Sequence, residues 1–403
     1  MWSPSSDCDF SRMRVDRDGL TWLTYAQLGC FGYFIFSFGP TLSLLREEQG
    51  LSSSVAGLHG SALAFGSLVS ALVVSSLVSR YGRMWVMWAG MVVMCLGIAM
   101  YTASLALPVT LLGMLVGGFG GTFVVVSSGP VLADRHGLSG PAAISEGNAV
   151  AAGVGMLAPL IVGVCVGVGL GWRPAMLLLV PVVVALAGGA RRIRAPRPAA
   201  TPHGVDRGGR LPPRFWLSWG VLSAGIAVEY CFTLWAADVL RERMGLAPGP
   251  SAAGVTALVA GMCAGRVAGG RLALRFPVDQ LLYAAISTTL LGFTGFWLAQ
   301  TALLGLPALV VCGLGIALFY PLGIARLIEA SEGRPDQASA RAGVGAALAA
   351  GAGPFVLGAV ADLVGLHLAL LVVPTPLGAA ATGVRLSQRR PVDLSEAPPT
   401  MPA

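Results

Sequence analysis

Ionisable side chains are scarce in the long apolar runs of this sequence, so the few that occur there are the first candidates for chemistry. Glu229 lies in the run VEYCFTLWAADVL, and Arg266 lies in the next apolar run along the chain. A charged side chain costs on the order of 3 kcal/mol to insert into a bilayer, and burial favours the protonated form of a carboxyl group. We therefore predict that Glu229 is an acid that binds a proton, with Arg266 as its candidate cation. The alternative is that Glu229 only ties two helices together.

Aromatic and hydroxyl-bearing side chains accompany this acid and could hold an organic solute beside it. Tyr230 and Trp235 lie in the same run as Glu229. Two other apolar runs contribute three more tyrosines, namely Tyr25, Tyr33 and Tyr320. We interpret these five aromatic residues, together with Glu229 and Arg266, as a cavity for proton coupling and substrate binding.

The usual sequence signatures of cofactor, metal and nucleic-acid chemistry are missing. The sequence has no lysine, so it cannot contain the G-x-x-x-x-G-K-[ST] loop that cradles phosphates. Its seven cysteines form no C-x-x-C pair, and its four histidines have no metal-binding spacing. The arginines lie in loops without the aromatic interleaving of a nucleic-acid-binding module. We expect no catalytic residue, cofactor, metal site or nucleic-acid partner.

The elements that must position the candidate residues are membrane-spanning helices. The chain has 403 residues, of which 55% are hydrophobic and 11% charged. Apolar runs of about 20 residues recur, which is the length needed to cross a hydrocarbon core about 30 Å thick. Six spans are predicted before a basic stretch and six after it, at residues 20–44, 55–78, 84–105, 108–132, 142–169, 174–189, 215–239, 251–274, 280–301, 304–327, 338–361 and 365–386.

This assignment places Glu229 near the middle of the membrane. It lies 14 residues after Phe215, hence about 20 Å deep at 1.5 Å per residue. Arg266 lies about 14 Å from the same side on the neighbouring span. The difference of about 7 Å allows the two groups to interact only through the long arginine side chain.

The basic stretch Arg191–Arg214 carries seven arginines against the single acid Asp206, together with several prolines, so we predict a solvated linker. Short basic loops stay in the cytoplasm. Alternating spans then place both termini and 21 of the 26 arginines on the cytoplasmic side, with four on the other side. We expect a multi-pass protein of the inner (plasma) membrane. The predicted units are 1–19 (N-terminal tail), 20–190 (first bundle), 191–214 (linker), 215–387 (second bundle) and 388–403 (C-terminal tail).

The two halves repeat one another. SSLVSRYGR ends the second span and GRLALRF ends the eighth, and aligning Pro159 with Pro354 places Glu146 opposite Arg341. Two six-span halves joined by a cytoplasmic loop are typical of secondary transporters built from parallel repeats, which bind substrate between the halves.

From about residue 20 to 388 the chain resembles the major facilitator superfamily. The stretch Ser79–Arg83 resembles the loop signature G-x-L-a-D-R-x-G-R-R, although Ser79, and Leu274 in the second half, replaces the aspartate. VEYCFTLWAADVL and GLGIALFYPLG resemble the seventh and tenth helices of fucose-permease-like members. The resemblance implies an all-α membrane protein of twelve helices in two pseudo-symmetric six-helix bundles.

The same resemblance implies a cytoplasmic gate. In this superfamily the fifth helix packs against the eighth and the eleventh against the second. Glu146 is then expected near Arg271 or Arg275, and Arg341 near Ser79 and Arg80. The alternative is that these are solvated loop charges. The predicted gate residues are Arg80, Arg83, Glu146, Arg271, Arg275 and Arg341.

We therefore expect a proton-coupled secondary active transporter that moves a small organic solute by alternating access. Protons, the solute and the lipid bilayer are its expected partners, and we expect a monomer. The string APLIVG, residues 158–163, approximates the G-P-x-x-G-G signature of drug:proton antiporters, so export of a drug or metabolite is an alternative. A transporter-like sensor is another alternative. An enzyme is not expected, because the spans hold too few ionisable residues for a catalytic cluster.

Overall fold

The computed structural model describes residues 15–190, 211–273 and 275–387, and these residues form helices without a strand. Twelve helical segments in this part are long and apolar enough to cross a membrane, which confirms the predicted number. Residues 1–14 of the predicted N-terminal tail, residues 191–210 of the predicted linker and the whole predicted C-terminal tail lie outside the described residues. Several helices run beyond the predicted spans because they continue past the apolar stretch, whereas others, such as Val278–Leu298 for the span predicted at 280–301, end before it. The span predicted at 108–132, for example, is the helix Leu107–His136.

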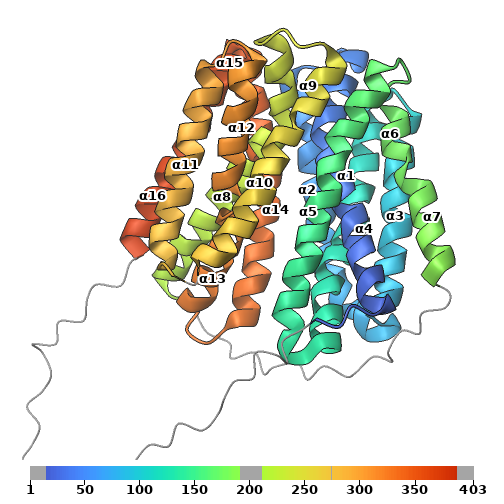
Figure 1. Cartoon of the computed structure of the whole chain (residues 1–403), viewed down its shortest axis with the longest axis vertical. Helices are drawn as coiled ribbons and strands as arrows, with labels where there is room; N and C mark the ends of the chain where they lie inside the picture. The colour runs from blue at the N-terminus through green and yellow to red at the C-terminus, as the bar shows by residue number, and fades with distance from the viewer. Residues whose placement is uncertain (1–14, 191–210, 274, 388–403) are drawn as a thin grey trace, which may run out of the picture.

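Six spans form each bundle (Figure 1). Those of the first bundle are α1 (Gly19–Gln49), α2 (Ser53–Tyr81), α3 (Arg83–Ala103), α4 (Leu107–His136), α5 (Gly140–Gly167) and the pair α6 (Arg173–Leu177) with α7 (Leu179–Ala190). Those of the second are α8 (Pro213–Glu242), α9 (Pro248–Gly254) with α10 (Thr256–Leu272), α11 (Val278–Leu298), α12 (Ala302–Ile316) with α13 (Phe319–Ala330), α14 (Pro335–Val364), and α15 (Leu366–Ala369) with α16 (Pro374–Ser387).

Helix ends follow the expected local chemistry. The Asp18 side chain accepts a hydrogen bond from the Thr21 backbone N–H and begins α1, and Ser52 caps α2 in the same way. Gly50 ends α1 with a positive φ of 60°, a conformation that glycine adopts without a Cβ clash. These caps fix where the chain reverses between the first two spans.

Glycine allows the helices of each bundle to approach closely. A Cβ on Gly97 of α3 would meet the Gly113 carbonyl oxygen of α4 at 2.6 Å. In the second bundle a Cβ on Gly292 of α11 would meet the Ala308 carbonyl oxygen of α12 at 2.9 Å. The same close helix pair therefore occurs at corresponding places in both halves, as the internal repeat predicts.

The halves meet along three sets of helices. Helix α1 contacts α8 and α9, α2 contacts α14, and α5 contacts α9 and α10. The predicted packing of the fifth span on the eighth, and of the eleventh on the second, is confirmed. Below, the linker end is the end at which α7 ends and α8 begins, at the bottom of Figure 1, and the distal end is the opposite one.

Candidate functional site

The two bundles pack tightly against each other toward the distal end. Gly39 of α1 lies so close to the Thr233 carbonyl of α8 that no Cβ would fit between them. The Ser61 hydroxyl of α2 donates a hydrogen bond to the Gly351 carbonyl of α14 at 2.9 Å. Thr233 therefore marks a point along α8 at which the two halves are in backbone contact.

Ion pairs join the halves above this contact. Arg46 at the end of α1 contacts Asp238 at 3.0 Å and Glu242 at 3.2 Å, both on α8. Arg241 of α8 pairs with Glu47 of α1. Asp238 is only 4% exposed, so its bond to Arg46 is shielded from water and from screening by salt. These pairs hold the distal ends of α1 and α8 together.

A carboxylate also crosses between the halves at the start of α2. Asp362 near the end of α14 accepts hydrogen bonds from the backbone N–H groups of Ser53 at 2.6 Å and Ser54 at 2.9 Å. The first N–H groups of a helix have no partner within the helix, and the helix dipole favours negative charge there. Asp362 thus completes the α2 cap from the other bundle.

This distal network was not predicted from the sequence. A usable signal was present, because the ends of the first and seventh spans carry complementary charges: Arg46 and Glu47 on one, and Asp238, Arg241 and Glu242 on the other. Without knowledge that these two helix ends meet, the pattern was not distinguishable from ordinary loop charges.

Glu229 lies one helical turn from Thr233 toward the linker end of α8. Its side chain is half-buried, and within the described residues its carboxyl group makes no hydrogen bond or ion pair. Arg266 of α10 is the charged residue that acts on it electrostatically, and the Glu229 carboxyl in turn acts on Tyr230 and Tyr320. The structure therefore brings four of the predicted cavity residues into one electrostatic neighbourhood.

Arg266 is likewise half-buried and, in the described part of the chain, has no hydrogen-bonded or ion-paired partner. Tyr320 is 48% exposed near the start of α13, although it lies within a predicted span. These polar side chains are therefore partly accessible next to the closed distal end, where an acid lies within electrostatic reach of a cation and two phenol groups.

The other three predicted cavity residues are used in helix packing. The Tyr33 hydroxyl donates to the Ala175 carbonyl at 2.7 Å, and the Trp235 indole N–H donates to the Pro354 carbonyl at 3.1 Å within the distal closure. The Tyr25 hydroxyl donates to Glu146 at 3.2 Å near the linker end. Depth along a span was predictable for these residues, but the direction of the side chain around the helix was not.

At the linker end of the first bundle, the charges pair within the bundle. Arg17 forms two hydrogen bonds to Glu146, both at 3.0 Å, and Arg83 pairs with Asp134. The predicted approach of Glu146 to Arg271 or Arg275 is not seen in the described residues. Arg17 replaces them as the partner, because the chain preceding α1 runs beside the start of α5.

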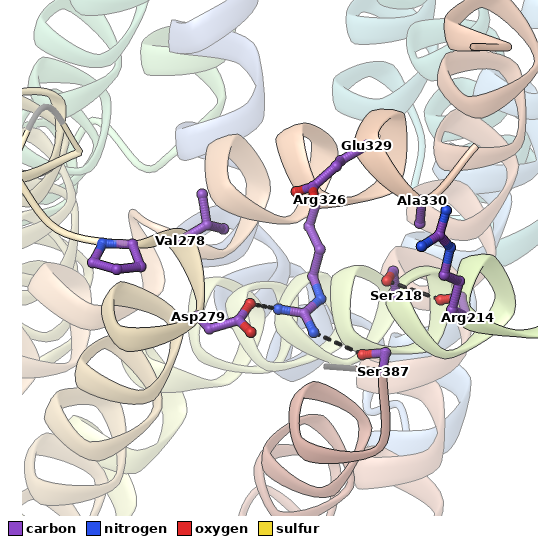
Figure 2. Close-up of a pocket in the computed structure, with 9 residues that line it drawn as sticks. Arg214, Ser218, Val278, Asp279, Arg326, Glu329, Ala330 and Ser387 are labelled. Atoms are coloured by element: carbon purple, nitrogen blue, oxygen red, sulfur yellow. Dashed lines mark hydrogen bonds and ion pairs between the residues drawn. The ribbon is translucent and has the colours of Figure 1, made fainter. Parts of the chain in front are cut away.

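The second bundle has a corresponding intramolecular pair around a pocket of about 290 Å³ (Figure 2). Arg326 at the end of α13 pairs with Asp279 at the start of α11 and donates to the Ser387 hydroxyl at 2.8 Å. In the first bundle the corresponding pair is Arg83 at the start of α3 with Asp134 near the end of α4. The two bundles therefore have an ion pair at the same place, but the acid and the arginine have exchanged helices.

Within the described residues, the side chains of the remaining predicted gate residues form no ion pair or hydrogen bond with the opposite bundle. Arg80 lies 5.2 Å from the centre of the Tyr81 ring, and the side chains of Arg271, Arg275 and Arg341 are exposed. Every ion pair between described residues at the linker end is internal to one bundle. Those at the distal end include the pairs that cross between bundles.

Nothing in the described residues suggests a metal centre, since no group of three or more His, Cys, Asp or Glu side chains converges there. The six described cysteines are free. His59, fully buried in α2, is engaged by the Ala56 carbonyl at 3.1 Å and the Thr110 hydroxyl at 2.9 Å. It is therefore a satisfied core histidine.

Comparison with known proteins identifies the fold. The profile of the Major Facilitator Superfamily matches residues 25–354. A search of curated proteins gave no match. Similar solved structures include a bacterial homologue of the human lysosomal transporter Spinster, inward-facing and unoccupied, with a TM-score of 0.69, 16% identity and coverage of 91% of this chain and 92% of that one. A variant of the nucleoside transporter NupG has a TM-score of 0.72 and 12% identity, with coverage of 92% of this chain and 99% of that one. A variant of the E. coli fucose:proton symporter FucP has a TM-score of 0.59 and 17% identity, with coverage of 91% of this chain and 98% of that one.

Proposed function

Because this chain belongs to the major facilitator superfamily, we propose that it is a proton-coupled secondary active transporter that moves a small organic solute by alternating access. The observation that carries this proposal is Glu229, an acid without a direct partner among the described residues, placed one turn below the closed distal end. An acid at that depth is expected to face a cavity, hold a proton or pair with a cation. FucP, one of the similar structures, is described as a proton symporter.

The arrangement of the halves supports alternating access. Cross-bundle ion pairs occur at the distal end, whereas those at the linker end stay within each bundle in the described part of the chain. With the basic linker in the cytoplasm, this is an inward-facing conformation, and both termini are cytoplasmic. We place the protein in the plasma membrane as a monomer, and we retain the predicted division into tails, linker and two bundles.

The predicted cytoplasmic gate belongs to this proposal as a second conformation. In the outward-facing state the ends of α5 and α10 would approach, so that Glu146 exchanges Arg17 for Arg271 or Arg275. Arg341 would then approach Ser79 and Arg80 at the junction of α2 and α14. Exposed ion pairs contribute only about 0 to 1 kcal/mol each, so such a gate opens and closes at low energetic cost.

The test is transport in proteoliposomes with an imposed pH gradient and a panel of candidate solutes. We expect Glu229→Gln to fold, to exchange solute across the membrane, and to lose accumulation driven by the gradient. Glu329→Gln is the matched control, because Glu329 is exposed at the linker end. Proton-driven accumulation that persists in Glu229→Gln removes this residue from the mechanism. The sign of the gradient response separates uptake from export, and binding without transport would indicate a sensor.

A further inference from the structure

All ionisable side chains near the middle of the proposed cavity come from the second bundle. Glu229 and Tyr230 lie on α8, Arg266 lies on α10, and Tyr320 lies on α13. The α1 face that continues from Gly39 toward the linker end supplies hydrocarbon over the next two turns, before the fully buried amide side chain of Gln27. That face carries the partly buried side chains of Ile35 and Phe31, one and two turns away. The cavity therefore has a charged side and an apolar side.

The charge balance of Glu229 and Arg266 restricts the substrate. Arginine stays protonated in proteins, so the pair is neutral overall only while Glu229 is ionised. When Glu229 takes up a proton, the site carries one net positive charge. Cys263, Tyr230 and Tyr320 are the other titratable side chains in electrostatic contact with the pair, and all are neutral in their ordinary protonation state. On the helices packed against α8, no other described charge acts on Glu229.

Each class of substrate leaves a different charge in the loaded site. A neutral or zwitterionic solute carried with one proton leaves a net charge of plus one, and a cation carried with one proton leaves plus two. An anion carried with one proton leaves zero, which is also the charge of the empty site. Only for an anion do both the empty and the loaded protein change conformation with a neutral site, which avoids a net charge in the low-dielectric interior.

We propose that the substrate is a small organic anion of one negative charge with an apolar body, whose carboxylate group binds Arg266 while Glu229 takes up the coupling proton. Its apolar body lies against Phe31 and Ile35 of the first bundle. Arg266 forms charge-assisted hydrogen bonds to the anion, and protonation of Glu229 removes the competing negative charge. Anion and proton therefore promote each other's binding by the same factor. This inference rests on the proposed transport function and names its substrate class.

The experiment uses two sets of probes with the same body and different charge: octanoate, octanamide and octylamine, and phenylacetate, phenylacetamide and phenethylamine. Binding to the full-length protein in detergent is followed by calorimetry, and proton uptake is followed with an indicator dye in weak buffer. We expect at least one carboxylate to bind tenfold or more tightly than its amide, with uptake of about one proton per anion. Arg266→Gln should abolish the preference, Arg266→Lys should retain part of it, and Glu229→Gln should abolish the proton uptake. The exposed arginine substitution Arg385→Gln should change neither.

A preference for the amide or amine, no binding of either carboxylate, an unchanged preference in Arg266→Gln, or binding without proton uptake would each overturn the inference. Its failure is distinguishable from failure of the proposed function. Gradient-driven accumulation of amides or amines would support the proposed transport function and refute the anionic substrate class. Conversely, carboxylate binding in detergent that depends on Arg266, without movement of any solute in proteoliposomes, would refute the transport function and support the anion-binding site.

Discussion

Two acids on α8 differ in their surroundings, which distinguishes the structural role of Asp238 from the coupling role proposed for Glu229. Asp238 is 4% exposed and bonded to Arg46 at 3.0 Å. Glu229, nine residues earlier, is half-buried and has no direct partner in the described part of the chain. A buried carboxylate with a fixed arginine stabilises one arrangement of helices, whereas an acid without a fixed partner can exchange a proton or bind a ligand group.

Substitution of Asp238 should loosen the distal closure. Asp238→Asn removes the buried charge that holds Arg46, and a lost charged hydrogen bond costs about 1 to 3 kcal/mol. We expect a shift toward an outward-facing state, measured as a severalfold faster reaction of a cysteine at Thr233 with a maleimide in a background free of other cysteines. Glu242→Gln removes the other partner of Arg46. The Glu242 side chain is 49% exposed, so this substitution should have little effect. Equal rates in the two variants would contradict a gating role for Asp238.

At the scale of the element, the start of α1 depends on one carboxylate. Asp18 accepts from the Thr21 backbone N–H at 2.9 Å and the Thr21 hydroxyl at 2.7 Å, and it also pairs with Arg135 at 2.7 Å. Partial burial opposes ionisation, but the Thr21 hydrogen bonds and Arg135 outweigh it, so the pKa of Asp18 is lowered. Its contribution to stability is present above its ordinary pKa and is lost as the pH falls through the lowered value.

Asp18→Ala should therefore lower the free energy of unfolding by about 1 kcal/mol at neutral pH, the usual cost of losing an N-cap. Thermal unfolding in detergent measures the difference from the wild type. The difference should shrink as the pH is lowered below the range in which a carboxyl group is normally ionised. Asp16→Ala, which changes an exposed acid two residues away, should have little effect. A difference that does not depend on pH would exclude the ionised cap as its source.

Glycines in the spans divide into those that allow close helix packing and those that do not. Gly97→Ala places a Cβ 2.6 Å from the Gly113 carbonyl oxygen, so α3 and α4 must move apart. Overpacking of this kind costs about 1 to 3 kcal/mol. Gly153→Ala on α5 meets no atom within 4 Å and should be neutral or slightly stabilising, since alanine favours helix. Thermal stability of the two variants, measured side by side, checks the distinction, and equal losses would contradict it.

At the scale of the whole molecule, two similar bundles meet at one end and are joined by a basic linker. Reporter tags at Gly204 and after Arg390 should indicate the cytoplasm, and tags at Gln49 and Pro248 the opposite side, because short basic loops remain inside. Accessibility of the tags in intact and permeabilised cells measures this. An external signal from the tag at Gly204 would reverse the orientation and with it the assignment of the inward-facing state.

The spans, the repeat of the two halves and the presence of an acid near mid-membrane were all predictable from the order of residues. These properties follow from the order of residues, since length, hydrophobicity and depth along a helix are read along one dimension. The tertiary structure decided which way each side chain points around its helix and which end of the molecule is closed. Tyr33 faces Ala175 and Glu146 pairs with Arg17 because of helix rotation and the path of the chain before α1. The closure depends on Gly39 meeting Thr233 and Arg46 meeting Asp238, residues almost two hundred positions apart. No local pattern encodes such contacts, because they form only when the two bundles tilt against each other.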